Sequence, residues 1–73
     1  MRLFAARQAR EDSLDACIAV MIVEAQFDGR PPPALGIAAF RVQRRLAASG
    51  VYVSFERVFY RLKKRDRGKV FVR

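Results

Sequence analysis

The chain has 73 residues, of which 15 are Lys or Arg and 7 are Asp or Glu, so its net charge is +8. A chain of this length forms one domain with a small core, and we expect that domain to span residues 1–73. Its content of 52% hydrophobic and 30% charged residues is typical of a globular domain and excludes a disordered tail. Such a positive charge favours polyanionic partners such as nucleic acid, with solubility alone as the alternative.

The composition also excludes most catalytic sites. The chain has no His, a single Cys and no glycine-rich phosphate-binding loop, which removes catalytic triads, disulfides, zinc sites and nucleotide-binding motifs. We therefore assign no catalytic residue, metal, cofactor or small-molecule ligand and expect a protein that is not an enzyme. Cys17 suits a small buried hydrophobe in an intracellular protein. The apolar run Ala16–Val23 is too short for a membrane span, so we expect no membrane partner and an intracellular location.

The first segment, residues 1–10, alternates weakly between apolar and polar residues. This pattern predicts either a short strand or a docking arm for a protein partner. The candidate docking residues are Arg2, Leu3, Phe4, Arg7 and Arg10.

A core helix is predicted over residues 11–28. Carboxylates such as Glu11 and Asp15 suit the first turn of a helix, where they cap free N–H groups; binding of a divalent cation is the alternative. Apolar residues then recur at helical spacing, and Val20, Val23 and Phe27 make the helix apolar almost all round. A proline triplet follows, which favours a rigid linker over a ligand for aromatic grooves.

A second helix is predicted over 34–49, ending at Gly50, and a third over 54–67, with Ser54 as its N-cap. Two sets of residues in the third helix repeat at helical spacing. The set predicted to be buried is Phe55, Val58, Phe59 and Leu62. The set predicted to form a basic outer face is Arg57, Tyr60, Arg61 and Lys64. Because surface substitutions cost little stability, we expect alanine at Arg57, Arg61 and Lys64 hardly to affect folding.

The candidate contact surface for nucleic acid or an acidic protein combines this face with nearby basic residues, since arginine binds phosphates and guanine edges and lysine adds mobile charge. Its residues are Arg41, Arg44, Arg45, Arg57, Tyr60, Arg61, Lys64, Arg65, Arg67 and Lys69.

The last segment, residues 69–73, alternates as a short strand does. A lone strand needs a partner, and the N-terminal segment is the candidate for it. The predicted fold is therefore mainly α: a three-helix, helix-turn-helix-like domain with a short two-stranded sheet formed by the chain termini.

Residues 34–73 resemble a winged helix-turn-helix protein in their order of helix, glycine-containing turn, capped basic helix and basic strand. Two features depart from that pattern: Glu56 stands six residues after Gly50, where the compact motif has an aliphatic residue, and the chain has only one wing strand. The resemblance implies a DNA-binding repressor, which typically dimerises to read paired half-sites.

In size and charge the chain also resembles small bacteriophage-encoded regulators that bind host RNA polymerase, including one from a Xanthomonas phage. This resemblance implies binding to the polymerase near nucleic acid and altered initiation or termination, as a transcription inhibitor or by antitermination. Three functions stay open: a regulator bound to RNA polymerase, a stand-alone DNA-binding repressor, and a structural protein that coats nucleic acid without specificity. The oligomeric state is not predicted.

Overall fold

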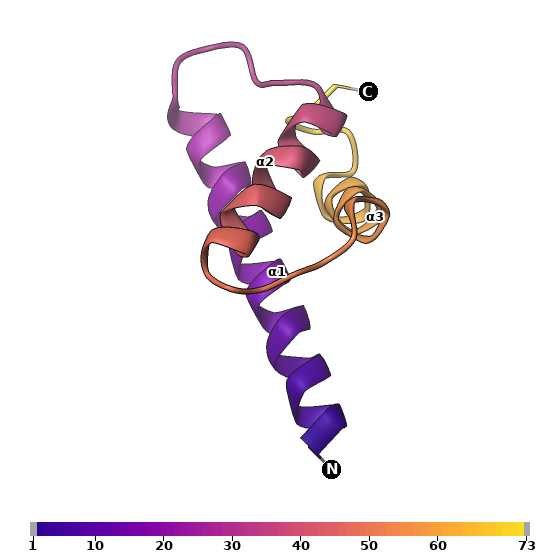
Figure 1. Cartoon of the computed structure of the whole chain (residues 1–73). Coiled ribbons are helices and arrows are strands. Elements are labelled where there is room, and N and C mark those ends of the chain that lie inside the picture. Colours follow the sequence, from indigo (N-terminus) through magenta and orange to yellow (C-terminus); the bar gives the residue numbers. More distant parts are fainter. Residues whose placement is uncertain (1, 73) are drawn as a thin grey trace.

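The computed structural model describes residues 2–72 and, beyond the first turn, the side chains of residues 5–72. Three helices follow one another: α1 (Arg2–Phe27), α2 (Leu35–Ala48) and α3 (Phe55–Asp66). Helices α2 and α3 pack together against one side of the longer α1 (Figure 1). The prediction of a mainly α protein with three helices is confirmed.

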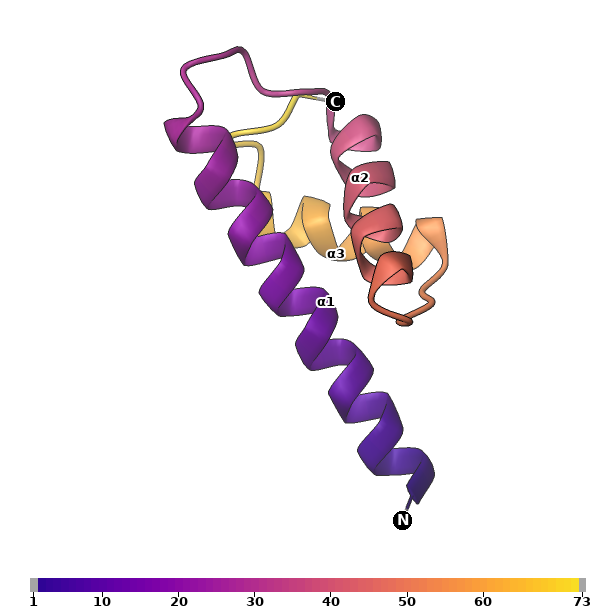
Figure 2. The ribbon, with the colours of Figure 1, turned by 60° about the vertical axis from the view of Figure 1, so that its left-hand side comes forward.

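Helix α1 begins at Arg2, so the prediction of a strand over residues 1–10 and of a helix start near Glu11 is wrong. Ala5, Ala6 and Ala9 explain the difference: alanine has the highest helix propensity, and no Gly or Pro interrupts the segment. Residues 5–10 are all exposed, and this end of α1 projects beyond α2 and α3 (Figure 2). We call residues 5–10 the N-terminal arm.

Helices α2 and α3 lie within one residue of their predicted bounds. Gly50 follows α2 with a φ of 81°, a left-handed conformation that glycine adopts without strain. The Ser54 hydroxyl accepts a hydrogen bond from the Arg57 backbone N–H at 3.3 Å, as expected of an N-cap. Figure 1 shows α3 nearly end-on while α2 lies in the plane of the picture, so the two helices cross steeply.

The predicted two-stranded sheet is wrong for the described residues, 2–72. The N-terminal segment is helical and points away from the tail. The tail instead forms one isolated parallel bridge, between Ala34 and Val72, and the Leu35 N–H donates to the Val72 carbonyl. The C-terminal segment therefore pairs with the start of α2, because that is where a free N–H is left at a helix start.

Buried Asp66 fixes the tail to the end of α3. It is 3% exposed, and its two carboxylate oxygens accept hydrogen bonds from the N–H groups of Val70 (2.9 Å) and Phe71 (3.1 Å). These bonds turn the chain back so that Phe71 enters the core, where it is also 3% exposed.

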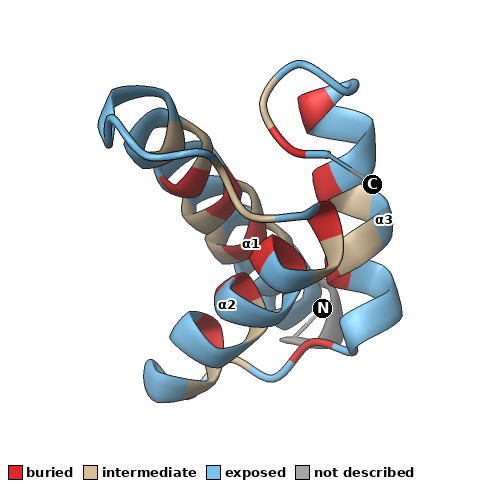
Figure 3. Ribbon diagram, turned by 90° about the horizontal axis from the view of Figure 1, so that it is seen from above, coloured by how far each residue is buried: buried red, intermediate tan, exposed pale blue. Residues whose placement is uncertain are grey.

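The core lies where the three helices meet the tail (Figure 3). Helix α1 contributes a single stripe to the core, as a core helix should, but Val20, Val23 and Phe27, the residues that make it apolar almost all round, are 49%, 52% and 84% exposed. The buried hydrophobic residues are Leu14, Ile18, Met21, Leu35, Ala38, Ala39, Val42, Leu46, Val53, Val58, Leu62 and Phe71.

None of the three helices in the described part of the chain has both the length and the hydropathy needed to cross a membrane.

Cys17 lies at the edge of this core, and burial raises the pKa of its thiol above the ordinary value of 9.0. Fewer thiolates therefore form at a given pH in the folded protein than in the unfolded chain. We expect iodoacetamide to alkylate Cys17 more slowly in buffer at pH 8.5 than in urea, as measured by mass spectrometry. Because the raised pKa means that the folded protein favours the protonated thiol, this group stabilises the fold fully at neutral pH. The free energy of unfolding is expected to fall as the pH rises past 9 and through the pKa of the folded protein. Equal rates in both solvents would contradict the raised pKa.

Candidate nucleic-acid interface

Helix α3 presents three different faces. Val58, Leu62 and Asp66 point into the core, and Phe55 and Phe59 stack beside them with ring centroids 5.9 Å apart. The two remaining faces carry the basic residues: one faces carboxylates of α1 and the other faces solvent.

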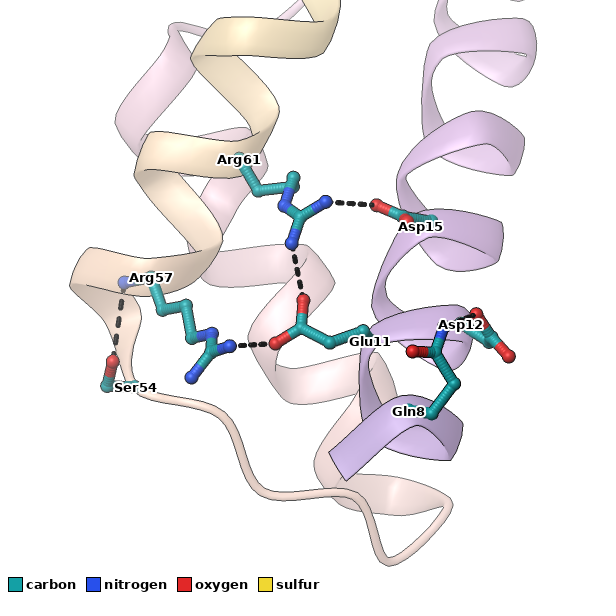
Figure 4. A network of polar contacts seen from close by, with 7 residues as sticks. All are labelled: Gln8, Glu11, Asp12, Asp15, Ser54, Arg57 and Arg61. Carbon is teal, nitrogen blue, oxygen red and sulfur yellow. Dashed lines mark hydrogen bonds and ion pairs between the residues drawn. The ribbon is translucent and has the colours of Figure 1, made fainter. Parts of the chain in front are cut away.

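One basic face points at α1. The Arg61 guanidinium contacts both Glu11 and Asp15, the latter at 3.3 Å, and Arg57 pairs with Glu11 (Figure 4). Arg65 pairs with Asp15 at 3.3 Å. Three arginines spaced four residues apart thus meet two carboxylates with the same spacing on the neighbouring helix. We call these five residues the α1–α3 ion-pair cluster.

The cluster changes the role of several residues. Glu11 and Asp15 lie inside α1, where they bind arginine, so neither caps a helix start. The sequence pattern placed Arg57 and Arg61 on the outer face. In the structure both form ion pairs with carboxylates of the same chain. The Arg61 side chain is only 33% exposed and that of Glu11 only 16%. We therefore no longer expect alanine at these arginines to leave folding unaffected.

The other basic face points to solvent. Tyr60 is 68% exposed, and Lys63, Lys64 and Arg67 are exposed around it. Their spacing places Tyr60, Lys63 and Lys64 on one side of the helix, and Arg67, which follows its last residue, lines one hollow with them. We call these four residues the outer face of α3. Within residues 5–72 none of its three cations takes part in an ion pair.

The outer face borders a shallow hollow of about 460 Å³. Its floor includes Leu35 and Phe71, and its rim includes Tyr60, Lys63 and Arg67. Lys69 lies next to this region, in a second hollow that it shares with Lys64 and Arg67. Positive charge therefore continues from the end of α3 onto the tail.

Arg67 adopts a backbone conformation that favours glycine. Its φ is 54°, in the left-handed region, and it is the only non-glycine residue with positive φ among the described residues. A side chain in this region costs roughly 1–2 kcal/mol. A strained residue that keeps a cation at the outer face is consistent with a functional role for that cation.

Replacing Arg67 with glycine is expected to raise the free energy of unfolding by about 0.5–1 kcal/mol, because glycine relieves the strain but loses more backbone entropy on folding. Urea denaturation monitored by circular dichroism measures the change. Arg67→Ala serves as the control because it removes the same side chain without relieving the strain. If both variants are equally destabilised, the conformation of Arg67 carries no strain.

The arginines of α2 lie apart from the outer face. Arg45 pairs with Glu24 of α1 at 3.4 Å, and Arg41 lies near the same carboxylate in a hollow between α1 and α2. Arg44 lies over the Phe40 ring, 5.8 Å from its centroid. The structure therefore does not join these three predicted contact residues to Tyr60 and Lys64.

Of the predicted docking residues, Arg7 and Arg10 are exposed on the N-terminal arm. The side chains of Arg2, Leu3 and Phe4 lie outside the described residues. Sequence reasoning missed Lys63, although its spacing of three residues from Tyr60 was a usable signal. It also missed buried Asp66, for which a short-range pattern gives no signal.

No protein-family model matches the chain, and no curated protein or solved structure matches it either.

Proposed function

We propose that this protein is a non-enzymatic transcription regulator that binds duplex DNA through the outer face of α3, in the cytoplasm or nucleoid of a bacterium. The observation that carries the proposal is the exposed group Tyr60, Lys63, Lys64 and Arg67 on and just after the second helix of an α2–turn–α3 unit. In helix-turn-helix proteins that helix enters the major groove, and cations there gain affinity by releasing counterions from phosphates.

The contrast between the two basic faces of α3 supports this choice. Glu11 and Asp15 offset part of the charge of the three arginines on the face toward α1, and this face packs against another helix, so it is less available to a large partner than the outer face. The outer face combines exposed cations with an exposed tyrosine, which can stack or hydrogen-bond. It is also the face that continues onto Lys69.

The test is fluorescence anisotropy with a labelled DNA duplex, measured between 50 and 200 mM salt. The triple variant with alanine at Lys63, Lys64 and Arg67 is expected to bind more weakly. The slope of log K against log salt is expected to decrease in magnitude by about one for each lost phosphate contact. The matched control carries alanine at Arg30, Arg41 and Arg44, which lowers the net charge equally on exposed residues elsewhere. Equal losses in both triple variants would contradict the assignment of the outer face.

Sequence selectivity separates a regulator from a protein that merely coats nucleic acid. A regulator is expected to enrich a common sequence from a pool of random duplexes and to bind it at least about 1,000-fold more tightly than a scrambled duplex. A coating protein binds both alike with a steep salt dependence. Absence of enrichment would favour the coating function.

A second candidate, binding to bacterial RNA polymerase, is favoured by the N-terminal arm. Its residues are exposed, and Arg7 and Arg10 give it positive charge. If this function holds, purified polymerase retains the protein, and the variant with Glu at Arg7 and Arg10 is retained less. In vitro transcription with and without the protein then distinguishes inhibition of initiation from antitermination. No retention at micromolar concentrations would exclude the polymerase as the partner.

A further inference from the structure

An exposed apolar stripe runs along α1 on the side away from the core. Val20, Val23 and Phe27 are 49%, 52% and 84% exposed, and Ala9 and Ala16 are exposed as well. These residues recur every three to seven positions, a spacing that keeps them on one side of an α-helix. We call these five residues the α1 stripe.

The middle of the stripe borders a hollow between α1 and the end of α2. The hollow has a volume of about 340 Å³. Ala16, Cys17 and Val20 line it from α1, and Leu46 and Val51 line it from the other side. Ser13, Arg45 and Ser49 complete the lining. A mostly apolar hollow beside exposed apolar residues is suited to packing against another macromolecule.

The charges along α1 indicate which macromolecule fits. The N-terminal arm carries Arg7 and Arg10, whereas Glu24 and Asp28 lie at the opposite end of the helix and just beyond it. Glu24 pairs with Arg45 of the same chain, whereas Arg7, Arg10 and Asp28 form no ion pair among the described residues. Two antiparallel copies related by a two-fold axis place the basic arm of each copy beside the acidic end of the other. A parallel arrangement would instead bring the two basic arms together.

We propose that the α1 stripe is a self-association surface on which two copies of this chain pack α1 against α1 in antiparallel orientation. The N-terminal arm of each copy then lies along the C-terminal half of its partner's α1. This arrangement covers Val23 and Phe27, which the monomer leaves exposed. It also gives the arm tertiary contacts, since its residues are all exposed in the monomer.

The proposal is tested by measuring absolute mass by sedimentation velocity, from micromolar to millimolar concentrations, on the full chain without nucleic acid. The unaltered protein is expected to reach the mass of a dimer. Val23→Glu is expected to stay monomeric, and Ile37→Glu to remain a dimer. Ile37 is the matched control because it is an aliphatic residue with the same 52% exposure on another helix. A monomer throughout, or equal effects of both substitutions, would overturn the proposal.

A charge exchange keeps the test valid if Val23→Glu proves unfolded by circular dichroism. Arg10→Glu is expected to weaken dimerisation, because it places a carboxylate near Asp28 of the other copy. Adding Asp28→Arg in the same chain is expected to restore it. Both side chains are exposed, so neither substitution disturbs the core. A dimer that does not respond to either change is not the antiparallel one.

Cross-linking tests the orientation. Cys17→Ser removes the only native thiol, and Ala9→Cys or Phe27→Cys is then introduced into separate chains. Under air oxidation a mixture of the two chains is expected to give the mixed disulfide, identified by its mass, in preference to either symmetric product. Predominant cross-linking of the Ala9→Cys chain to itself would show a parallel pair and overturn the proposal. Because no nucleic acid is present in these measurements, their failure leaves the proposed DNA binding standing, and the reverse also holds.

Discussion

Replacing Asp66 with alanine is expected to lower the free energy of unfolding by about 3 kcal/mol. The carboxylate is 3% exposed and accepts the N–H groups of both Val70 and Phe71. A hydrogen bond to a charged group contributes roughly 1.5–3 kcal/mol, and a donor left without a partner in the interior adds its desolvation cost. Because a domain of this size has only a few kcal/mol of stability, the variant should be partly unfolded at room temperature.

Urea denaturation followed by circular dichroism measures this loss, with Asp66→Asn and Asp28→Ala as comparisons. Asparagine keeps one acceptor oxygen and is expected to retain about half of the contribution. Asp28 is an exposed aspartate, so its removal is expected to change stability by less than about 0.5 kcal/mol. A midpoint for Asp66→Ala close to that of Asp28→Ala would show that the tail does not depend on this carboxylate.

Replacing Arg61 with alanine is expected to cost about 1–2 kcal/mol. Arg61 is the central member of the α1–α3 ion-pair cluster, with contacts to both Glu11 and Asp15. Fully exposed pairs contribute less than about 1 kcal/mol, but Glu11 is only 16% exposed, and losing one partner of a shielded charge costs more. Lys64→Ala, which removes a cation from the outer face, is expected to cost under about 0.5 kcal/mol.

Thermal or urea unfolding of Arg61→Ala and Lys64→Ala measures this difference at low salt and again in 1 M NaCl. Salt is expected to reduce the difference in stability between the two variants, since it screens the partly exposed members of the cluster. A double-mutant cycle with Glu11→Gln isolates the pair itself. Equal destabilisation by the two substitutions would show that the cluster does not hold α1 to α3.

The helices that were predicted accurately are those with strong local signals. Ser54 and Gly50 mark the ends of the turn between α2 and α3, and apolar residues at helical spacing define the buried sides of both helices. The start of α1 was missed because its alanines give high helix propensity but no apolar periodicity. The tail pairs with Ala34 rather than with the N-terminus because α1 carries that end of the chain away from it.

The candidate interface could be predicted only in part for a similar reason. Helical spacing places Arg57 and Arg61 close to Tyr60 and Lys64, so one sequence pattern covers two faces of α3. What separates the faces is the position of α1, whose Glu11 lies 46 residues from Arg57 in the sequence. A pairing over that distance depends on how the helices pack, and neither charge counts nor periodicity shows it.

The projecting N-terminal arm also affects how the protein behaves in solution. The molecule measures 43 × 20 × 16 Å, and its radius of gyration is 12.4 Å, compared with about 11 Å for a compact domain of this length. A rod-like shape raises the frictional coefficient, so even a monomer should elute early from a gel-filtration column. Elution volume alone would therefore overstate its mass, whereas small-angle scattering would report the elongation directly.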